Sequence, residues 1–184
     1  MGCGRRAWPL VLVLLALPAF SSAADMPAMP GMAHHAAKHP TFTQVVGAYR
    51  VELHLLPPEE FYTATEVAAK HVTEGMLIVG GLPPVAVGAT PAPNHHLIVH
   101  VFDNASGMAV TDAKVQMSIR PVGADGHPTG RSTDVPVVMM QAIGAGAAST
   151  HYGNNLAIPA GAYVVTVIVN HTSTTARFPI RIES

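Results

Sequence analysis

The chain has 184 residues, enough for one domain with a substantial core, and only 11% of them are charged. Ten basic and eleven acidic residues give a net charge of −1, which excludes a strongly basic nucleic-acid-binding surface. Eleven histidines and nine methionines stand beside these few charges. Imidazole binds divalent copper, zinc and iron, and thioether binds copper(I), but methionine also fills cores and histidine also lies on surfaces. Composition leaves both interpretations open.

The first 24 residues have the three parts of a secretory signal peptide. Arg5 and Arg6 are the basic segment, residues 10–20 are an apolar run too short to span a bilayer, and small residues end at Ala24. We expect cleavage after Ala24 and a periplasmic protein. Cys3 leaves with the signal, so the mature chain has no thiol. Eight basic residues then remain against eleven acidic ones, a net charge of −3.

Residues 25–43 are rich in proline, alanine, methionine and histidine and lack helical or strand periodicity. We expect a flexible, disordered tail there that collects metal ions loosely. The composition changes near Val45, and residues 44–184 are expected to form one domain.

Short apolar alternations separated by turn signals fill that domain. Residues 59–74 are expected to form a helical turn or a long loop, and Asn104–Gly107 is a hairpin signal. The expected strands are residues 51–55, 76–79, 96–103, 110–121, 135–142, 151–158, 163–169 and 176–182. Seven or eight strands with almost no helical pattern predict an all-β fold, an immunoglobulin-like antiparallel β-sandwich.

Two histidines on the expected strand 96–103 are candidate ligands. His96 and His100 share a face but lie about 13 Å apart along a regular strand, so at most one of them binds a given ion. His96 begins the strand and is the better candidate. His100 lies between apolar neighbours, where a buried, hydrogen-bonded role is expected. His54 lies on the polar side of the first strand, where exposure is expected.

Met139 and Met140 are adjacent on a strand, so one is expected in the core and the other on the opposite face. His151 follows across a glycine- and alanine-rich loop, and a strand return can bring it beside Met140. His171 ends the apolar stripe of the strand 163–169, where a rim position suits a ligand.

Three segments in this order carry a resemblance to a known family: VVMMQ (137–141), HYGNN (151–155) and GAYVVT (161–166). They resemble the immunoglobulin-like periplasmic ferrous-iron transport proteins, which accompany iron permeases and also bind copper. A histidine-bearing strand and hairpin at 95–107 matches as well. The resemblance covers roughly residues 45–183.

That family binds metal through histidines and a methionine. By position, the resemblance implies His96, His151 and Met140 or Met139 as ligands, with His171 as a substitute for the last histidine. The chain departs from the family at Ile98, where members have an acidic residue. Its loop before His151 is longer, and its segment after the last matched strand is shorter.

We therefore expect a non-enzymatic protein that binds iron or copper ions and delivers them to an inner-membrane metal permease. No cysteine, defensible Ser-His-Asp order or cofactor motif predicts catalysis, and no nucleic acid is expected; a homodimer is left open. The alternative is a structural or interaction domain of the periplasm or cell surface, with incidental histidines. Convergence of the histidines in space distinguishes the two.

Overall fold

The computed structural model describes residues 40–85, 89–170 and 175–183. The predicted signal peptide, residues 25–39 of the predicted tail and His171 lie outside these ranges. Within them the chain forms eleven strands, one short α-helix and one 3₁₀ turn.

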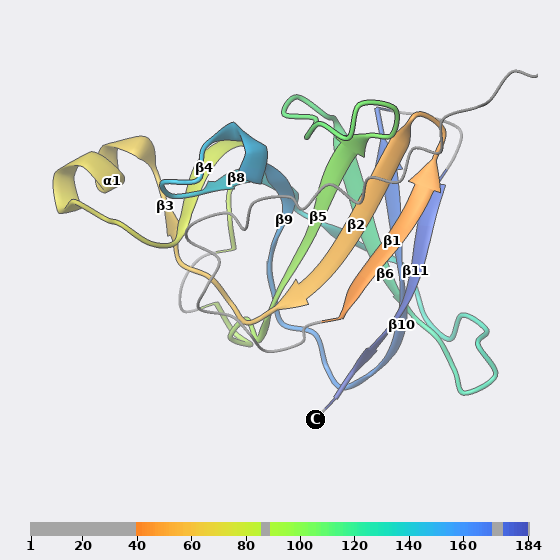
Figure 1. The fold of residues 1–184 in the computed structure, drawn as a ribbon. Coiled ribbons are helices and arrows are strands. Elements are labelled where there is room, and N and C mark those ends of the chain that lie inside the picture. The colour runs from red at the N-terminus through yellow and green to blue at the C-terminus, as the bar shows by residue number, and fades with distance from the viewer. Residues whose placement is uncertain (1–39, 86–88, 171–174, 184) are drawn as a thin grey trace, which may run out of the picture.

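The strands form two sheets that pack face to face (Figure 1). The seven-stranded sheet runs β1-β2-β5-β9-β8-β4-β3, and the four-stranded sheet runs β11-β10-β6-β7. Paired neighbours are antiparallel except β3 and β4. The strands are β1 (Thr41–Val46), β2 (Tyr49–Leu56), β3 (Phe61–Tyr62), β4 (Met76–Gly81), β5 (His95–Asp103), β6 (Val115–Pro121), β7 (Thr133–Val135), β8 (Val138–Ala142), β9 (His151–Leu156), β10 (Gly161–Val169) and β11 (Thr175–Ile182). The predicted all-β sandwich is confirmed.

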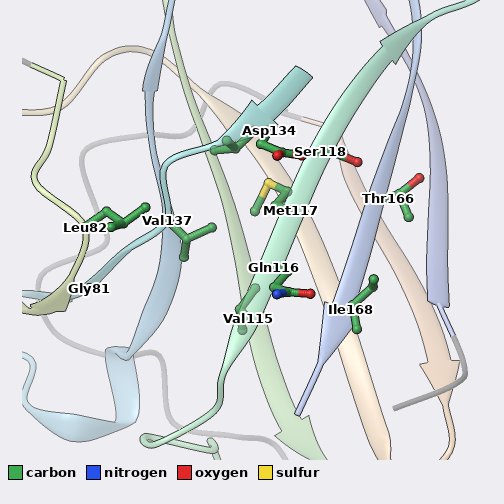
Figure 2. Close-up of a pocket in the computed structure, with 11 residues that line it drawn as sticks. Gly81, Leu82, Val115, Gln116, Met117, Ser118, Asp134, Val137, Thr166 and Ile168 are labelled. Carbon is green, nitrogen blue, oxygen red and sulfur yellow. The ribbon is translucent and has the colours of Figure 1, made fainter. Parts of the chain in front are cut away.

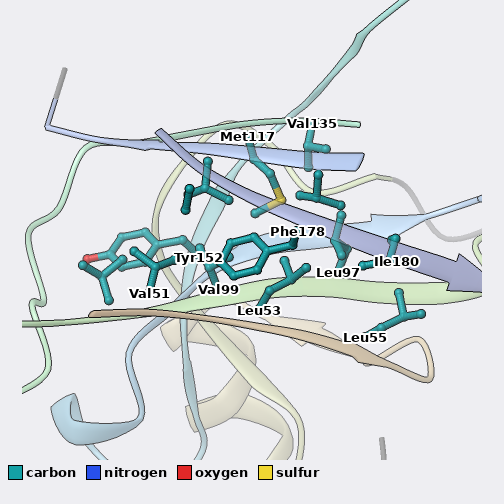
Figure 3. Packing of buried hydrophobic residues seen from close by; sticks show 14 of the residues in the cluster. Val51, Leu53, Leu55, Leu97, Val99, Met117, Val135, Tyr152, Phe178 and Ile180 are labelled. Carbon is teal, nitrogen blue, oxygen red and sulfur yellow. The ribbon is translucent and has the colours of Figure 1, made fainter. Parts of the chain in front are cut away.

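The core lies between the sheets and follows from the alternation of the strands. Val51, Leu53 and Leu55 of β2 point inward and meet Phe178 and Ile180 of β11 (Figure 3). Because side chains alternate along a strand, the even-numbered neighbours of these β2 residues face outward. The inner face supplies the hydrophobic stabilisation and leaves the outer face of the large sheet free for other groups.

Tyr152 fixes the orientation of β9. Its ring is buried in the core, at 2% exposure, and its hydroxyl donates to the Val110 carbonyl at 2.8 Å and accepts from the Ala113 N–H at 3.0 Å. Since Tyr152 points inward, the side chain of its neighbour His151 points to the outer face, and Gly153 has the same outward parity.

The structure differs from the predicted strands in several places, and one difference has a clear local cause. The strand predicted at 110–121 begins only at Val115. Residues 135–142 were expected to be one strand, but Pro136 lacks the N–H needed for a continuous ladder. The chain crosses there from β7 in the small sheet to β8 in the large one. Strand β1 begins at Thr41, so the last three residues of the predicted tail belong to the sheet. The short β3 was not predicted.

Helix α1 (Ala64–Lys70) lies in the segment expected to hold a helical turn or loop. Thr63 caps its start and exchanges hydrogen bonds with Glu66 in a capping box. Neither this helix nor any other in the described ranges has the length and apolar character to cross a membrane.

Candidate functional site

A row of chemically distinctive side chains crosses the outer face of the large sheet. Met140 of β8 pairs with His151 of β9. The register of β5 with β9, which pairs Val99 with Tyr152, brings His100 opposite His151 when continued by one residue. Glu52 of β2 pairs with His100. Antiparallel register thus sets a row of a thioether, two imidazoles and a carboxylate across four neighbouring strands.

Four histidines, which we call the histidine cluster, gather along this row: His54, His96, His100 and His151. Their rings form a chain of contacts. The centroids are 5.2 Å apart between His54 and His100, 5.3 Å between His100 and His151, and 5.9 Å between His151 and His96. These residues are separated by up to 97 positions in the sequence and meet only through strand pairing.

Burial increases along the cluster. His54 and His100 are half-buried, whereas His151 is 2% exposed and His96 is completely buried. The ring of Phe61 lies 5.5 Å from that of His96. Beside it a second apolar cluster forms on the outer face, built on Ile98 and Met140.

Asn155 fixes the loop from Glu59 to Phe61, which covers His96 and which we call the cover of the cluster. It lies opposite His96 in the β5–β9 register. Its side-chain oxygen accepts from the Glu59 N–H at 3.1 Å, and its amide donates to the Glu59 carbonyl at 2.7 Å. This double contact fixes the loop that leads into Phe61 above the sheet.

Several imidazole nitrogens in this buried region lack a well-formed hydrogen bond, although the Asn155 side chain lies beside His96 and the Glu52 carboxylate lies 3.9 Å from Nε2 of His54. Both ring nitrogens of His96 and the Nε2 atoms of His151 and His54 are buried without a hydrogen bond. A buried polar atom left unpaired costs about 1–3 kcal/mol, so native structures rarely retain several at one place without a reason. A bound cation would use the free lone pairs.

The hydrogen bond of His151 to a backbone carbonyl fixes its tautomer. Its Nδ1 lies 2.8 Å from the Ser149 carbonyl oxygen, which can only accept, so Nδ1 carries the hydrogen. Nε2 therefore holds the lone pair. Metal-binding histidines commonly have one nitrogen fixed by a carbonyl and the other free for the ion.

All four members of the cluster favour the neutral form. Burial, and secondly the nearby ring of His151, lower the pKa of His96 to about 3. Burial, followed by His151 and His54, lowers the pKa of His100 to about 3. Burial also lowers the pKa values of His151 and His54. At neutral pH the cluster consequently presents uncharged imidazoles, the form that binds metals.

Gly153 allows β9 to approach β5 at the centre of the cluster. It pairs with Ile98, between His96 and His100 on β5. A Cβ atom at this position would lie 2.8 Å from the Ile98 Cα and closer still to the Leu97 carbonyl oxygen. Only glycine fits this contact.

The structure brings together three of the five residues named as ligands from the sequence. His96, Met140 and His151 share the outer face. Met139 lies on the opposite face of β8, packed against the sandwich core, and is not brought to the histidines. His171 lies outside the described residues.

Sequence reasoning missed two members of the cluster. His54 was expected to be exposed but is half-buried. His100 was expected to be buried and hydrogen-bonded, and it is half-buried with a hydrogen bond to the Thr150 carbonyl, but its contact with His151 was not predicted. Their shared outward parity on β2 and β5 was visible, but the register that brings them within ring contact was not.

No group of three histidine, cysteine, aspartate or glutamate side chains in the described ranges is arranged to hold a metal ion. Two histidines with Met140 are a different donor set, because its third member is a thioether sulfur.

A hollow of about 530 Å³ lies elsewhere (Figure 2). It is lined by β6, β7 and β10 and by Gly81, Leu82 and Val137. Asp134 is its single ionisable side chain, and no histidine lines it. Without converging polar groups it is a weaker candidate than the histidine cluster.

Comparisons of this chain with protein-family models, curated proteins and solved structures find no match.

Proposed function

We propose that this protein is a periplasmic metal-binding protein that captures copper or iron ions and delivers them to a membrane transporter. The observation that carries the proposal is the pair His96 and His151, whose rings lie 5.9 Å apart with three buried nitrogens that make no well-formed hydrogen bond. A polar pair so placed has no evident structural use, whereas a cation bound between the rings would satisfy it.

The donor set favours copper(I). Met140 is fully buried and lies opposite His151 in the β8–β9 register, where paired Cβ atoms are about 5 Å apart. Two imidazoles and one thioether form a soft set that suits copper(I) better than iron(II). Ile98, which replaces the acidic residue of the resembling family, adds apolar surface at the same place. Iron(II) would need oxygen ligands from water.

The proposed mechanism is capture and handover without bond-making chemistry. The neutral, tautomer-fixed imidazole of His151 binds without first losing a proton. The cover that Asn155 and Phe61 form over His96 keeps bulk water away from a bound ion. The inner-membrane permease and the periplasmic location come from the signal-like N-terminus and the family resemblance. Residues 25–39 would collect ions for the cluster.

The test is the affinity of the full chain for copper(I) and iron(II), measured by competition with a chromophoric chelator under anaerobic conditions. The double variant His96→Ala/His151→Ala should lose at least about a hundredfold in affinity at the cluster. The matched control His71→Ala/His127→Ala removes two exposed loop histidines and should leave it unchanged. Equal affinity of wild type and His96→Ala/His151→Ala would refute the proposal and favour a structural or interaction domain.

A further inference from the structure

We propose that the histidine cluster contains a second copper(I) position, formed by His100 and His151 with Met140 in the same row, which shares His151 with the position at His96. This inference rests on the proposed function and adds a ligand to it. The rings of His100 and His151 are 5.3 Å apart, closer than those of His96 and His151.

The first support is a shared tautomer. The Nδ1 atom of His100 lies 3.2 Å from the Thr150 carbonyl oxygen, as that of His151 lies 2.8 Å from the Ser149 carbonyl. Both oxygens can only accept, so both Nδ1 atoms carry hydrogen and both Nε2 atoms hold lone pairs. The consecutive carbonyls of Ser149 and Thr150 therefore fix the same tautomer in His151 and His100, with Nε2 free to bind a metal ion.

The second support is the rigidity of the turn that supplies these carbonyls, which runs from Gly146 to Thr150. The Ser149 hydroxyl donates to the Gly146 carbonyl at 2.7 Å and accepts from the Ala142 N–H at 3.1 Å. The Thr150 hydroxyl donates to the Ala147 carbonyl at 2.7 Å and accepts from Gln141 at 3.1 Å. Ser149 and Thr150 are each 1% exposed. The hydroxyls of Ser149 and Thr150 therefore fix the turn, and with it the positions of the two backbone carbonyls that accept from His151 and His100.

The third support is the row itself. Met140, His151 and His100 lie on three adjacent strands and share the outer face, so Met140 and His100 flank His151 in the row. Two histidines and a methionine are again a soft donor set.

Geometry separates the two positions. His96 and His100 are four residues apart on β5, about 13 Å along a regular strand, so they cannot bind one ion together. His151 contacts both rings and is the imidazole that the two positions share, with Met140 opposite it in the register. One ion therefore occupies one position at a time. The position at His100 lies nearer to solvent, because His100 is half-buried and His96 is fully buried.

The experiment uses full-length chain labelled with ¹⁵N at histidine, titrated with copper(I) under ascorbate and read by long-range ¹H–¹⁵N spectra that resolve each imidazole. Without copper, His100 and His151 should both show hydrogen on Nδ1. Copper(I) should shift the Nε2 signals of both, in wild type and in His96→Ala. His127→Ala, which removes an exposed turn histidine, is the matched control.

Affinity measurements complete the test. His96→Ala and His100→Ala should each reduce copper(I) affinity by at most about tenfold, because one position remains, and the double variant by more than about a hundredfold. If His96→Ala alone abolishes the copper response, or if Nε2 of His100 never shifts in wild type, the second position is wrong while the proposed function stands. If wild type shows no copper response at His151, the second position is wrong, and if it binds neither copper(I) nor iron(II) at the cluster, the proposed function itself fails.

Discussion

The side chain of Asn155 holds the backbone of Glu59 from both sides, accepting from its N–H at 3.1 Å and donating to its carbonyl at 2.7 Å. These residues are 96 positions apart, and their contact fixes the loop before β3 over His96. The burial of His96 in the histidine cluster therefore depends on one side-chain amide, that of Asn155.

Replacing Asn155 by alanine should therefore loosen this cover. Loss of a doubly bonded, buried amide should lower the free energy of unfolding by about 1–3 kcal/mol. Amide hydrogen exchange near residues 59–62 should accelerate before global unfolding, as expected for a local opening. Asn104→Ala, at an exposed turn, is the control and should change neither quantity. Unchanged exchange at 59–62 in Asn155→Ala would show that the amide does not hold the cover.

Gly153→Ala should be severely destabilising. A methyl group there would collide with the backbone of β5 at Leu97 and Ile98, so the two strands must separate. We expect a loss of about 3 kcal/mol or more in urea unfolding. Gly80→Ala is the matched control, because its Cβ would meet only the end of the flexible Met139 side chain, at 3.4 Å. A loss for Gly153→Ala no larger than that of the control would contradict the close approach.

The Tyr152 hydroxyl should be worth measurable stability. Tyr152→Phe keeps the ring in the core but leaves the Val110 carbonyl and the Ala113 N–H without this partner. We expect a loss of about 1–2 kcal/mol in chemical denaturation. Tyr163→Phe also removes a hydroxyl bonded to a carbonyl, that of Pro159, but at an exposed position, and should cost less than about 0.5 kcal/mol. Equal losses of unfolding free energy in the two variants would show that burial of the Tyr152 hydrogen bonds does not increase their contribution to stability.

Acid should destabilise the metal-free protein through the histidine cluster. The pKa values of His96 and His100 are lowered to about 3 in the folded state, against about 6.5 unfolded. As the pH falls below 6.5, the unfolded chain takes up protons that the folded chain does not, so stability declines until the pH nears 3. Above 6.5 these residues add no pH dependence.

The expected slope below that point approaches 1.4 kcal/mol per pH unit for each such histidine. Unfolding free energies measured between pH 7.5 and 5 separate this effect from most carboxylate titration. His100→Gln should reduce the slope by about one proton. A flat profile between pH 6.5 and 5 would exclude neutral, buried imidazoles.

The sequence predicted local features well where alternation was strict. The inward residues of β10 and β11 follow period-two patterns, and Tyr163 to Val169 and Ala176 to Ile182 were expected strands. The break at Pro136 was missed because the apolar run continues across it, although a proline cannot donate a ladder hydrogen bond and is excluded from central strands.

The candidate site was harder to predict because it depends on non-local register. His151 and Met140 were expected to meet across a glycine- and alanine-rich loop, and they pair directly. His100 is opposite His151 only because β5 and β9 pair with one particular register, which no local pattern fixes. Its outward parity was therefore compatible with either a structural or a ligand role.

The crossing at Pro136 also affects how the small sheet ends. Strand β7 is an edge strand, and it stops after three residues because the chain leaves for the other sheet. An edge this short offers few free backbone groups as a template for a foreign strand, which is one way natural proteins avoid edge-to-edge aggregation. The proline that divides a predicted strand thus also protects the domain from self-association through this edge.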